Sequence, residues 1–175
     1  MTPFDFFHSA VLRSPDAEAA VVLSGNCEVL DRASFKELER KVLSFAAALQ
    51  GLTGQQRPRM VLVCHNSMAM LTAILATYLC RGVLIPLTPN NPEAELREQI
   101  GVAKPDVIVI DDTVQSLSSG HSVPVIQIGA TQAGFDSFEA LLTRFADAMP
   151  QVAEAQGEDI IALKFTGGSS GRPKA

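Results

Sequence analysis

The run Met60-Val61-Leu62-Val63-Cys64 is apolar throughout, and Val83-Leu84-Ile85-Pro86-Leu87 repeats this pattern further along the chain. Between the two runs, residues 67–79 are apolar nearly all the way round a helix, which is typical of a deeply packed helix. Apolar runs without alternation indicate strands that are buried on both faces, as in parallel sheets. This stretch therefore predicts a right-handed βαβ unit, two parallel strands joined by a helix.

The alternation of strands and helices continues after this unit. Residues 93–103 predict a charged surface helix, and Val107-Ile108-Val109-Ile110 is another uninterrupted β-branched run. A further strand is expected over residues 124–128, and a last one over residues 160–163. We therefore expect an α/β fold with a doubly wound, mainly parallel sheet flanked by helices.

The first part of the chain predicts smaller elements. Residues 4–13 are typical of a short amphipathic helix. Residues 19–23 and 27–30 predict two short strands, joined by a hairpin-like turn at Ser24-Gly25-Asn26.

Ser34 and Glu37 indicate the start of a longer helix, because a serine followed three residues later by a glutamate forms a capping box. Apolar residues at alternating steps of three and four predict its buried face. They are Phe35, Leu38, Val42, Phe45 and Leu49. We expect Gly51 and Gly54 to end this helix.

Two other segments are interpreted as connections. Residues 112–120 predict a polar, serine-rich loop. Residues 131–156 predict a helix followed by a polar linker. The helix is expected around Phe138, Leu141, Leu142 and Phe145.

The composition limits the classes of function. Hydrophobic residues make up 47% of the 175 residues, which is ample for a core. The net charge of −5 gives no electrostatic reason to expect nucleic acid or an anionic membrane as a partner. No apolar stretch reaches the ~20 residues of a membrane span, and the N-terminus lacks the basic region of a signal peptide. We expect a soluble, cytoplasmic protein.

The cysteines and histidines are interpreted first as structural residues. Cys27, Cys64 and Cys80 lack a paired spacing such as CxxC, so we expect buried thiols in a reducing compartment and no metal site. His65 is expected to be a loop or capping residue, and Asp111-Asp112 a solvated turn. His8 and His121 are expected on the surface. No Ser/His/Asp set can be assembled from these residues.

The sequence Phe165-Thr166-Gly167-Gly168-Ser169-Ser170-Gly171-Arg172-Pro173-Lys174-Ala175 follows the last expected strand directly. Glycines allow backbone N–H groups to turn around an anion, and hydroxyl and ammonium groups add further donors. Ligands of doubly wound sheets bind beyond the carboxyl ends of the strands, which is where this segment starts. These features predict a phosphate-binding loop.

Other interpretations of this loop were weighed. It does not match GxxxxGK[ST], because Arg172 follows Gly171, and it does not match GxGxxG. A flexible glycine-serine tail is possible on composition, but Pro173 stiffens the exit next to Lys174, which a tail does not require. An unrelated α/β phosphate binder remains a further alternative.

Residues 165–174 resemble the ATP-phosphate loop of the adenylate-forming (AMP-binding) superfamily, whose pattern is aromatic-Thr-Ser-Gly-Thr/Ser-Thr/Ser-Gly-x-Pro-Lys-Gly. That superfamily includes acyl- and aryl-CoA synthetases, luciferases and the adenylation domains of peptide synthetases. Gly167 and Ala175 depart from the pattern, which has Ser and Gly at these places. Three upstream stretches, residues 30–38, 60–79 and 79–93, are similar to family elements in the same order.

The resemblance implies an ATP-dependent carboxylic acid ligase. Such an enzyme forms an acyl-adenylate and pyrophosphate, and then commonly a thioester with CoA or with the phosphopantetheine of a carrier protein. The implied cofactors are ATP and Mg²⁺, with the Mg²⁺ ligands downstream of this chain. The implied partners are a small carboxylic acid, the remainder of the same enzyme and a carrier protein.

The resemblance also assigns the site residues. The loop is expected to bind the β- and γ-phosphates of ATP through its side-chain and backbone donors, and no catalytic residue is identifiable in this chain. The assigned residues are Thr166, Gly167, Gly168, Ser169, Ser170, Gly171 and Lys174.

The resemblance divides the chain into two parts. Residues 1–158 are expected to form the first α/β subdomain of the large N-terminal domain of such an enzyme. Residues 159–175 are expected to be a strand plus the ATP-phosphate loop, the start of a missing remainder, so the fragment alone should be inactive. The alternatives are a non-catalytic interaction module of the same ancestry and an amino-acid adenylation domain. We favour an acyl- or aryl-acid ligase over the latter.

Overall fold

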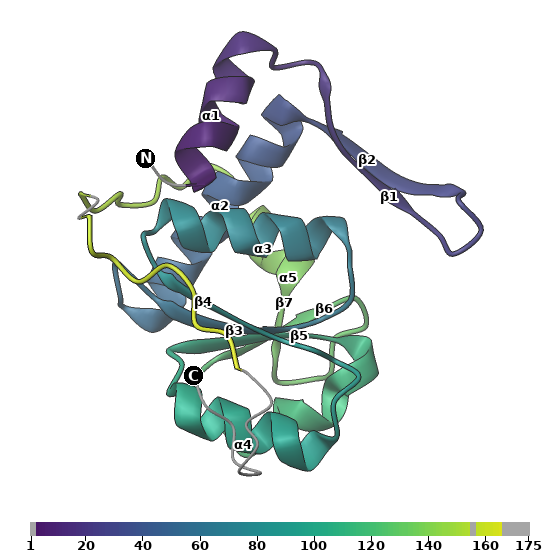
Figure 1. The fold of residues 1–175 in the computed structure, drawn as a ribbon, viewed down its shortest axis with the longest axis vertical. Coiled ribbons are helices and arrows are strands. Elements are labelled where there is room, and N and C mark those ends of the chain that lie inside the picture. Colours follow the sequence, from purple (N-terminus) through teal and green to yellow (C-terminus); the bar gives the residue numbers. More distant parts are fainter. Residues whose placement is uncertain (1–2, 155–156, 166–175) are drawn as a thin grey trace.

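A parallel sheet forms the centre of the molecule in the computed structural model, which describes residues 3–154 and 157–165 (Figure 1). The strand order is β4-β3-β5-β6-β7, and each neighbouring pair is parallel. The strands are β3 (Arg59–Val63), β4 (Val83–Leu87), β5 (Val107–Asp111), β6 (Val125–Ile128) and β7 (Asp136–Ser137). The sheet predicted from the apolar runs is therefore confirmed, whereas β7 is too short to leave a pattern in the sequence.

The central strands are buried on both faces. Val61 lies opposite Ile85 on one side and Ile108 on the other, and all three side chains are fully buried. This is why their sequences are continuously apolar instead of alternating between apolar and polar residues.

Helices cover both faces of the sheet (Figure 1). Met60 and Leu62 of β3 pack into the core on one face, and Val61 and Val63 pack into the core on the other. The first face carries α2 (Phe35–Thr53), α3 (Met68–Leu79) and α5 (Phe138–Arg144). The second face carries α4 (Glu93–Ala103) and the 3₁₀ helix η1 (Asp112–Ser118). The expected doubly wound arrangement is confirmed.

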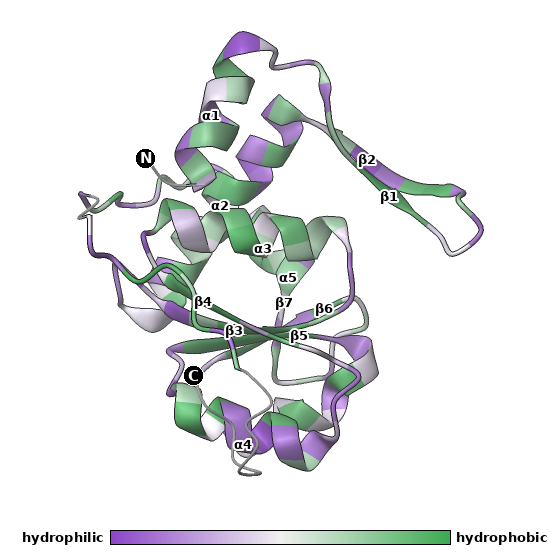
Figure 2. Cartoon of the chain, viewed as in Figure 1, coloured by the Kyte–Doolittle hydropathy of each residue, from purple (hydrophilic) through white to green (hydrophobic). Residues whose placement is uncertain are grey.

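Helix α3 is mostly hydrophobic on the side that Figure 2 shows. It packs against β4, against α2 and against α1 (Pro3–Arg13), so every one of its residues is buried or half-buried. Helix α4 has a polar outer surface (Figure 2), and its buried side chains are Leu96, Gln99, Ile100 and Ala103.

The N-terminal strands form an antiparallel hairpin that extends away from the helices (Figure 1). They are β1 (Glu18–Leu23) and β2 (Val29–Ser34). The second strand starts later than predicted, because Cys27 adopts a left-handed conformation (φ 62°) and belongs to the turn. The turn is closed by Ser24 N–H, which donates to the carbonyl oxygen of Glu28 at 2.8 Å.

The predicted capping box at the start of α2 is confirmed. Glu37 N–H donates to Ser34 Oγ at 3.3 Å, and Ser34 N–H donates to Glu37 Oε2 at 2.8 Å. The predicted end of α2 is correct for Gly54, which has φ 67°, but wrong for Gly51, which lies inside the helix. The predicted face is buried at Leu38, Val42, Phe45 and Leu49, and Phe35 is half-buried.

The segment after β5 differs from the prediction of a plain loop. Residues 112–118 form η1, because the Asp111 side chain accepts a hydrogen bond from Thr113 N–H at 3.0 Å and caps the first turn. Val114 and Leu117 of η1 are buried against the second face of the sheet. Serine-rich composition suggested a solvated loop, but these two apolar residues anchor the segment to the core.

Candidate functional site

The strand order reverses between β3 and β5. The chain leaves β3 for β4 on one side, and then crosses back to β5 on the other side of β3. In open α/β sheets, ligands bind beyond the carboxyl ends of the strands at such a reversal. β3 ends at Val63 and β5 ends at Asp111, so the residues around these two ends form the candidate site.

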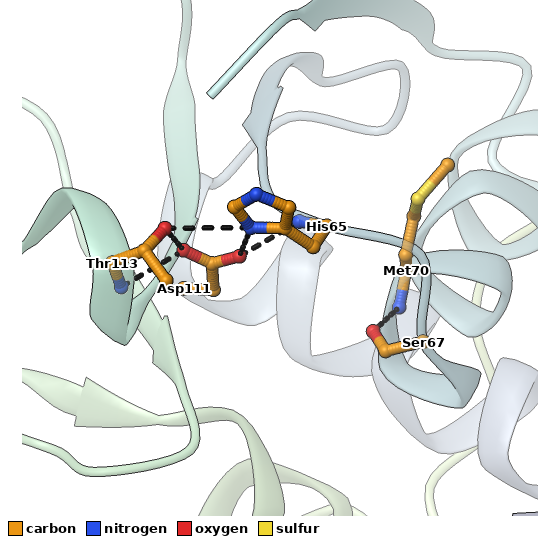
Figure 3. A network of polar contacts seen from close by, with 5 residues as sticks. All are labelled: His65, Ser67, Met70, Asp111 and Thr113. Atoms are coloured by element: carbon orange, nitrogen blue, oxygen red, sulfur yellow. Dashed lines mark hydrogen bonds and ion pairs between the residues drawn. The ribbon is translucent and has the colours of Figure 1, made fainter. Parts of the chain in front are cut away.

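His65 and Asp111 join the ends of β3 and β5 in this site (Figure 3). Asp111 Oδ2 accepts from His65 N–H at 2.7 Å and lies 2.8 Å from His65 Nδ1. Asp111 Oδ1 accepts from Thr113 N–H at 3.0 Å and from Thr113 Oγ1 at 2.5 Å. The carboxylate therefore fixes the imidazole ring, and the other ring nitrogen, Nε2, points away from Asp111 (Figure 3).

The electrostatics of this pair favour two charged partners. The hydrogen bond to Asp111 raises the pKa of His65, and a side-chain contact with Asn90 adds to the effect. Burial of Asp111 opposes ionisation, but the hydrogen bonds from Thr113 and His65 outweigh burial and lower the pKa of the carboxyl group. The His65 side chain is 50% exposed and Asp111 only 11%, so the carboxylate is the buried anchor and the imidazole faces outward.

The sequence-based interpretation of these residues is partly wrong. Asp111-Asp112 was expected to be a solvated turn, whereas Asp111 is buried and hydrogen-bonded to His65. His65 lies in a loop, as expected, two residues before Ser67, whose hydroxyl caps α3 by accepting from Met70 N–H at 3.1 Å (Figure 3). The positions of the two residues could have predicted that they lie close together. Both follow buried apolar runs, and the carboxyl ends of such strands meet at one edge of a parallel sheet.

The predicted phosphate-binding residues Thr166, Gly167, Gly168, Ser169, Ser170, Gly171 and Lys174 lie outside the described residues, so their assignment stays a prediction. The segment that leads to them is described. Leu84 N–H donates to the carbonyl oxygen of Ile161 at 3.0 Å, and Leu163 N–H donates to the carbonyl oxygen of Leu84 at 2.9 Å. Instead of the full strand predicted over residues 160–163, this segment makes a single parallel bridge to β4, between Leu84 and Ala162.

The direction of this bridge shows how the segment before the predicted phosphate-binding loop runs relative to His65 and Asp111. Because residues 161–163 run parallel to β4, they proceed toward the edge where β3 and β5 end. Neighbouring strands lie about 4.8 Å apart, and β4 separates this segment from β3. Phe165, the last described residue, is thus directed toward the His65 edge and packs against the core on the α4 side.

The cysteines differ from one another in their surroundings. Burial raises the pKa of Cys64 to about 12, with a further contribution from Asp111, and burial raises the pKa of Cys80 to about 12. Both therefore stay protonated and behave as the buried thiols that were predicted. Cys27 is exposed in the hairpin turn, so that part of the prediction was wrong.

The other histidines lie away from this edge. His8 Nδ1 is 2.6 Å from Glu39 Oε1, and nearly half of the His8 side chain is exposed, as expected. His121 is half-buried instead of exposed, and burial lowers its pKa. Within residues 3–154 and 157–165, no three His, Cys, Asp or Glu side chains are grouped to hold a metal ion. Every helix in the same part of the chain is too short or too polar to cross a membrane.

Comparison with known proteins gives a family match over nearly the whole chain. Residues 7–175 match the family model described as AMP-binding enzyme. The chain is 25% identical over 170 residues to Fusarin C synthetase of Gibberella fujikuroi, covering 97% of this chain and 4% of the synthetase. It is 26% identical over 157 residues to 4-coumarate–CoA ligase 5 of Oryza sativa subsp. japonica, covering 89% of this chain and 29% of the ligase.

The fold is also shared with solved structures. The anthranilate CoA ligase AuaEII, in complex with anthranoyl-AMP, superposes with a TM-score of 0.80 at 16% identity. The superposition covers 99% of this chain and 33% of AuaEII. At this identity the likeness shows the fold alone, and the chain spans well under half of each relative named above.

Proposed function

This chain belongs to the AMP-binding enzyme family, and from that premise we propose that it is the N-terminal part of an ATP-dependent carboxylic acid ligase. The family match over residues 7–175 is the observation that carries the proposal. The short share of each relative that the chain spans supports the view that further domains complete the enzyme. In this proposal residues 1–158 form the first subdomain, and residues 159–175 begin the ATP-binding part.

The proposed reaction starts with adenylation. An oxygen of the substrate carboxylate attacks the α-phosphorus of ATP, a P–O bond to the β-phosphate breaks, and pyrophosphate leaves. The product is an acyl-adenylate, the class of compound named in the AuaEII complex. Charge moves onto the leaving pyrophosphate, so fixed donors near the phosphates accelerate the step.

The ATP-phosphate loop would supply those donors. We assign side-chain donors to Thr166, Ser169, Ser170 and Lys174, and backbone N–H donors to Gly167, Gly168 and Gly171. The loop contributes mainly through its backbone, so Gly167 in place of the usual serine keeps most of the donor set. Following the family resemblance, we place the Mg²⁺ ligands downstream of this chain and assign them no step here.

A second half-reaction would transfer the acyl group to a thiol. The thiolate attacks the carbonyl carbon, the bond to the AMP oxygen breaks, and AMP leaves as a thioester forms. The similarity to a coumarate–CoA ligase supports CoA as the acceptor, and the similarity to Fusarin C synthetase supports the phosphopantetheine of a carrier protein. The second similarity also keeps an amino-acid adenylation domain as the alternative function. Three free thiols favour a reducing compartment, so we propose a cytoplasmic enzyme.

Acid-dependent exchange of pyrophosphate into ATP tests the proposal. The full-length enzyme that carries this chain is assayed over a panel of aryl, fatty and amino acids, and this chain is assayed alone. We expect exchange with one class of acid in the full-length enzyme and none with this chain, which lacks most of the proposed site.

A matched pair of lysines ties the activity to the loop. Lys174→Ala should lower the exchange rate by about a hundredfold, because one charged donor to the phosphates is lost. Lys164→Ala removes an exposed lysine just before the loop and should leave the rate unchanged. Equal rates for the two variants, or no acid that supports exchange, would contradict the proposal.

A further inference from the structure

The segment between α5 and the ATP-phosphate loop lies near the end of the sheet where β3 starts, opposite the edge that carries His65 (Figure 1). It then reaches β4. Three contact points with the described residues of this segment are made by α2, by the connection after α2 and by β4. The third point is the single backbone bridge to Leu84. Ordering a segment costs conformational entropy at each residue, and one bridge on a sheet edge offsets little of that cost. The two side-chain contact points therefore add to this bridge and to the packing of Ala162, Leu163 and Phe165 against the cores.

Gln50, in the last turn of α2, makes the first contact point. Its Nε2 donates to the carbonyl oxygen of Gln151 at 2.7 Å, and its Oε1 accepts from Gln151 N–H at 2.8 Å. The side-chain amide thus pairs with both backbone groups of one residue, as a neighbouring strand would. Gln56 Nε2 adds a bond to Gln151 Oε1 at 2.7 Å.

Arg57 makes the second contact point, between the end of α2 and the start of β3. Its Nη1 lies 2.7 Å from Asp159 Oδ1, and its Nη2 donates to the carbonyl oxygen of Glu154 at 2.6 Å. The guanidinium group therefore holds the chain at two places, one on each side of residues 155–156. The Asp159 side chain is only 20% exposed, which limits competition from water and salt for this ion pair.

We propose that Arg57, assisted by Gln50, is a positioning residue for the ATP-phosphate loop. The inference rests on the proposed function of that loop. Asp159, which Arg57 holds, lies three residues before Ala162 of the β4 bridge, so Arg57 constrains where residues 161–163 meet β4, just ahead of the loop. A displacement of about 1 Å in a group that orients a reacting substrate costs about a hundredfold in rate, so a loose start of the loop should weaken the use of ATP.

Arg97 provides a matched control for Arg57. It also binds one carboxylate and backbone carbonyls, with Nε 2.7 Å from Glu93 Oε1 and Nη2 2.6 Å from the carbonyl oxygen of Ser116. The two arginine side chains are equally exposed, at 37% for Arg97 and 36% for Arg57. Arg97 lies on α4 and makes these bonds to α4, to η1 and to Ser119 just after η1, not to residues 151–163.

Amide hydrogen exchange on this chain tests the anchoring without any activity. Arg57→Ala should speed exchange of Leu163 N–H and Leu84 N–H by about tenfold relative to Arg97→Ala, because both bonds depend on the docked segment. Asp159→Asn should have a similar effect, and the double variant should add little to either single change. Equal exchange in the Arg57 and Arg97 variants would overturn the proposal.

Steady-state kinetics of the full-length enzyme test the positioning. Arg57→Ala should raise KM for ATP by about tenfold while KM for the acid stays unchanged, and Arg57→Lys should recover part of the loss. Arg97→Ala should change neither KM. Faster hydrogen exchange with unchanged KM for ATP would overturn the positioning role. Absence of adenylation in the unsubstituted enzyme would instead overturn the proposed function, and the exchange data would still decide the anchoring.

Discussion

His65 illustrates why single residues of the site could not be assigned from the sequence. Its partner Asp111 is 46 residues away, and only the parallel pairing of β3 with β5 brings the two together. By contrast, the capping box of Ser34 and Glu37 was predicted correctly, because both of its hydrogen bonds join residues within one helical turn. Local rules determine the caps, whereas the sheet topology determines the site.

The His65–Asp111 pair should make the stability of this chain depend on pH. The pKa of His65 is raised on folding, so the contribution of the imidazolium is fully present below its unfolded pKa of about 6.5 and is lost as the pH rises through the folded pKa. The pKa of Asp111 is lowered, so its contribution is present above an unfolded value of about 3.9. The pair should therefore stabilise most between about pH 4 and 6.5.

The variant His65→Gln tests this dependence. We expect its free energy of unfolding to fall below that of the unsubstituted chain at pH 5, and the difference to shrink toward pH 9, as measured by urea titration. His121→Gln serves as the control, because burial lowers the pKa of His121 and its loss should not reproduce this pH trend. A difference that grows with pH above the normal histidine range would show that the imidazole is bound as the neutral form.

At the scale of elements, the apolar runs predicted the buried strands correctly. Segments 160–163 and 112–118 were predicted less accurately. β3, β4 and β5 were recognisable because both of their faces are buried. The segment 160–163 has a similar apolar sequence but makes one bridge, and Ile160 is 61% exposed. Hydrophobicity therefore indicated a strand, but among the described residues this segment pairs with β4 only between Leu84 and Ala162. The 3₁₀ helix η1 depends on the Asp111 cap, which composition did not reveal.

Gly82 tests how tightly α3 and β4 are connected. A Cβ atom on this residue would lie 2.3 Å from the carbonyl oxygen of Pro58, which also accepts from Val83 N–H at 3.0 Å. Gly82→Ala should therefore cost at least about 1–3 kcal/mol of unfolding free energy, because backbone has to move. Gly101→Ala, on α4 where a Cβ meets no atom within 4 Å, should instead stabilise by about 0.5–1 kcal/mol. Urea unfolding of both variants checks this, and equal stabilities would contradict the tight contact.

At the scale of the whole molecule, the sequence predicted the fold class correctly, because the alternation of buried strands and helices is a long-range pattern that one sequence displays. The resemblance of residues 165–174 to an ATP-phosphate loop agrees with the AMP-binding enzyme family match over residues 7–175. Residues 166–174 lie outside the described part of the chain, so the described geometry of the candidate site is that of His65, Asp111 and Thr113. The substrate acid could not be predicted, because no residue of the sequence was assigned to bind it.

The proposed reaction of the whole enzyme depends on one step, the attack of the substrate carboxylate on the α-phosphorus of ATP. The most direct test supplies an accepted acid with heavy oxygen in its carboxylate, together with ATP and a thiol acceptor, to the full-length enzyme. Attack at the α-phosphorus predicts that AMP carries one labelled oxygen and that pyrophosphate carries none. Label in inorganic phosphate, with ADP as the nucleotide product, would mean attack at the γ-phosphorus and would contradict the account.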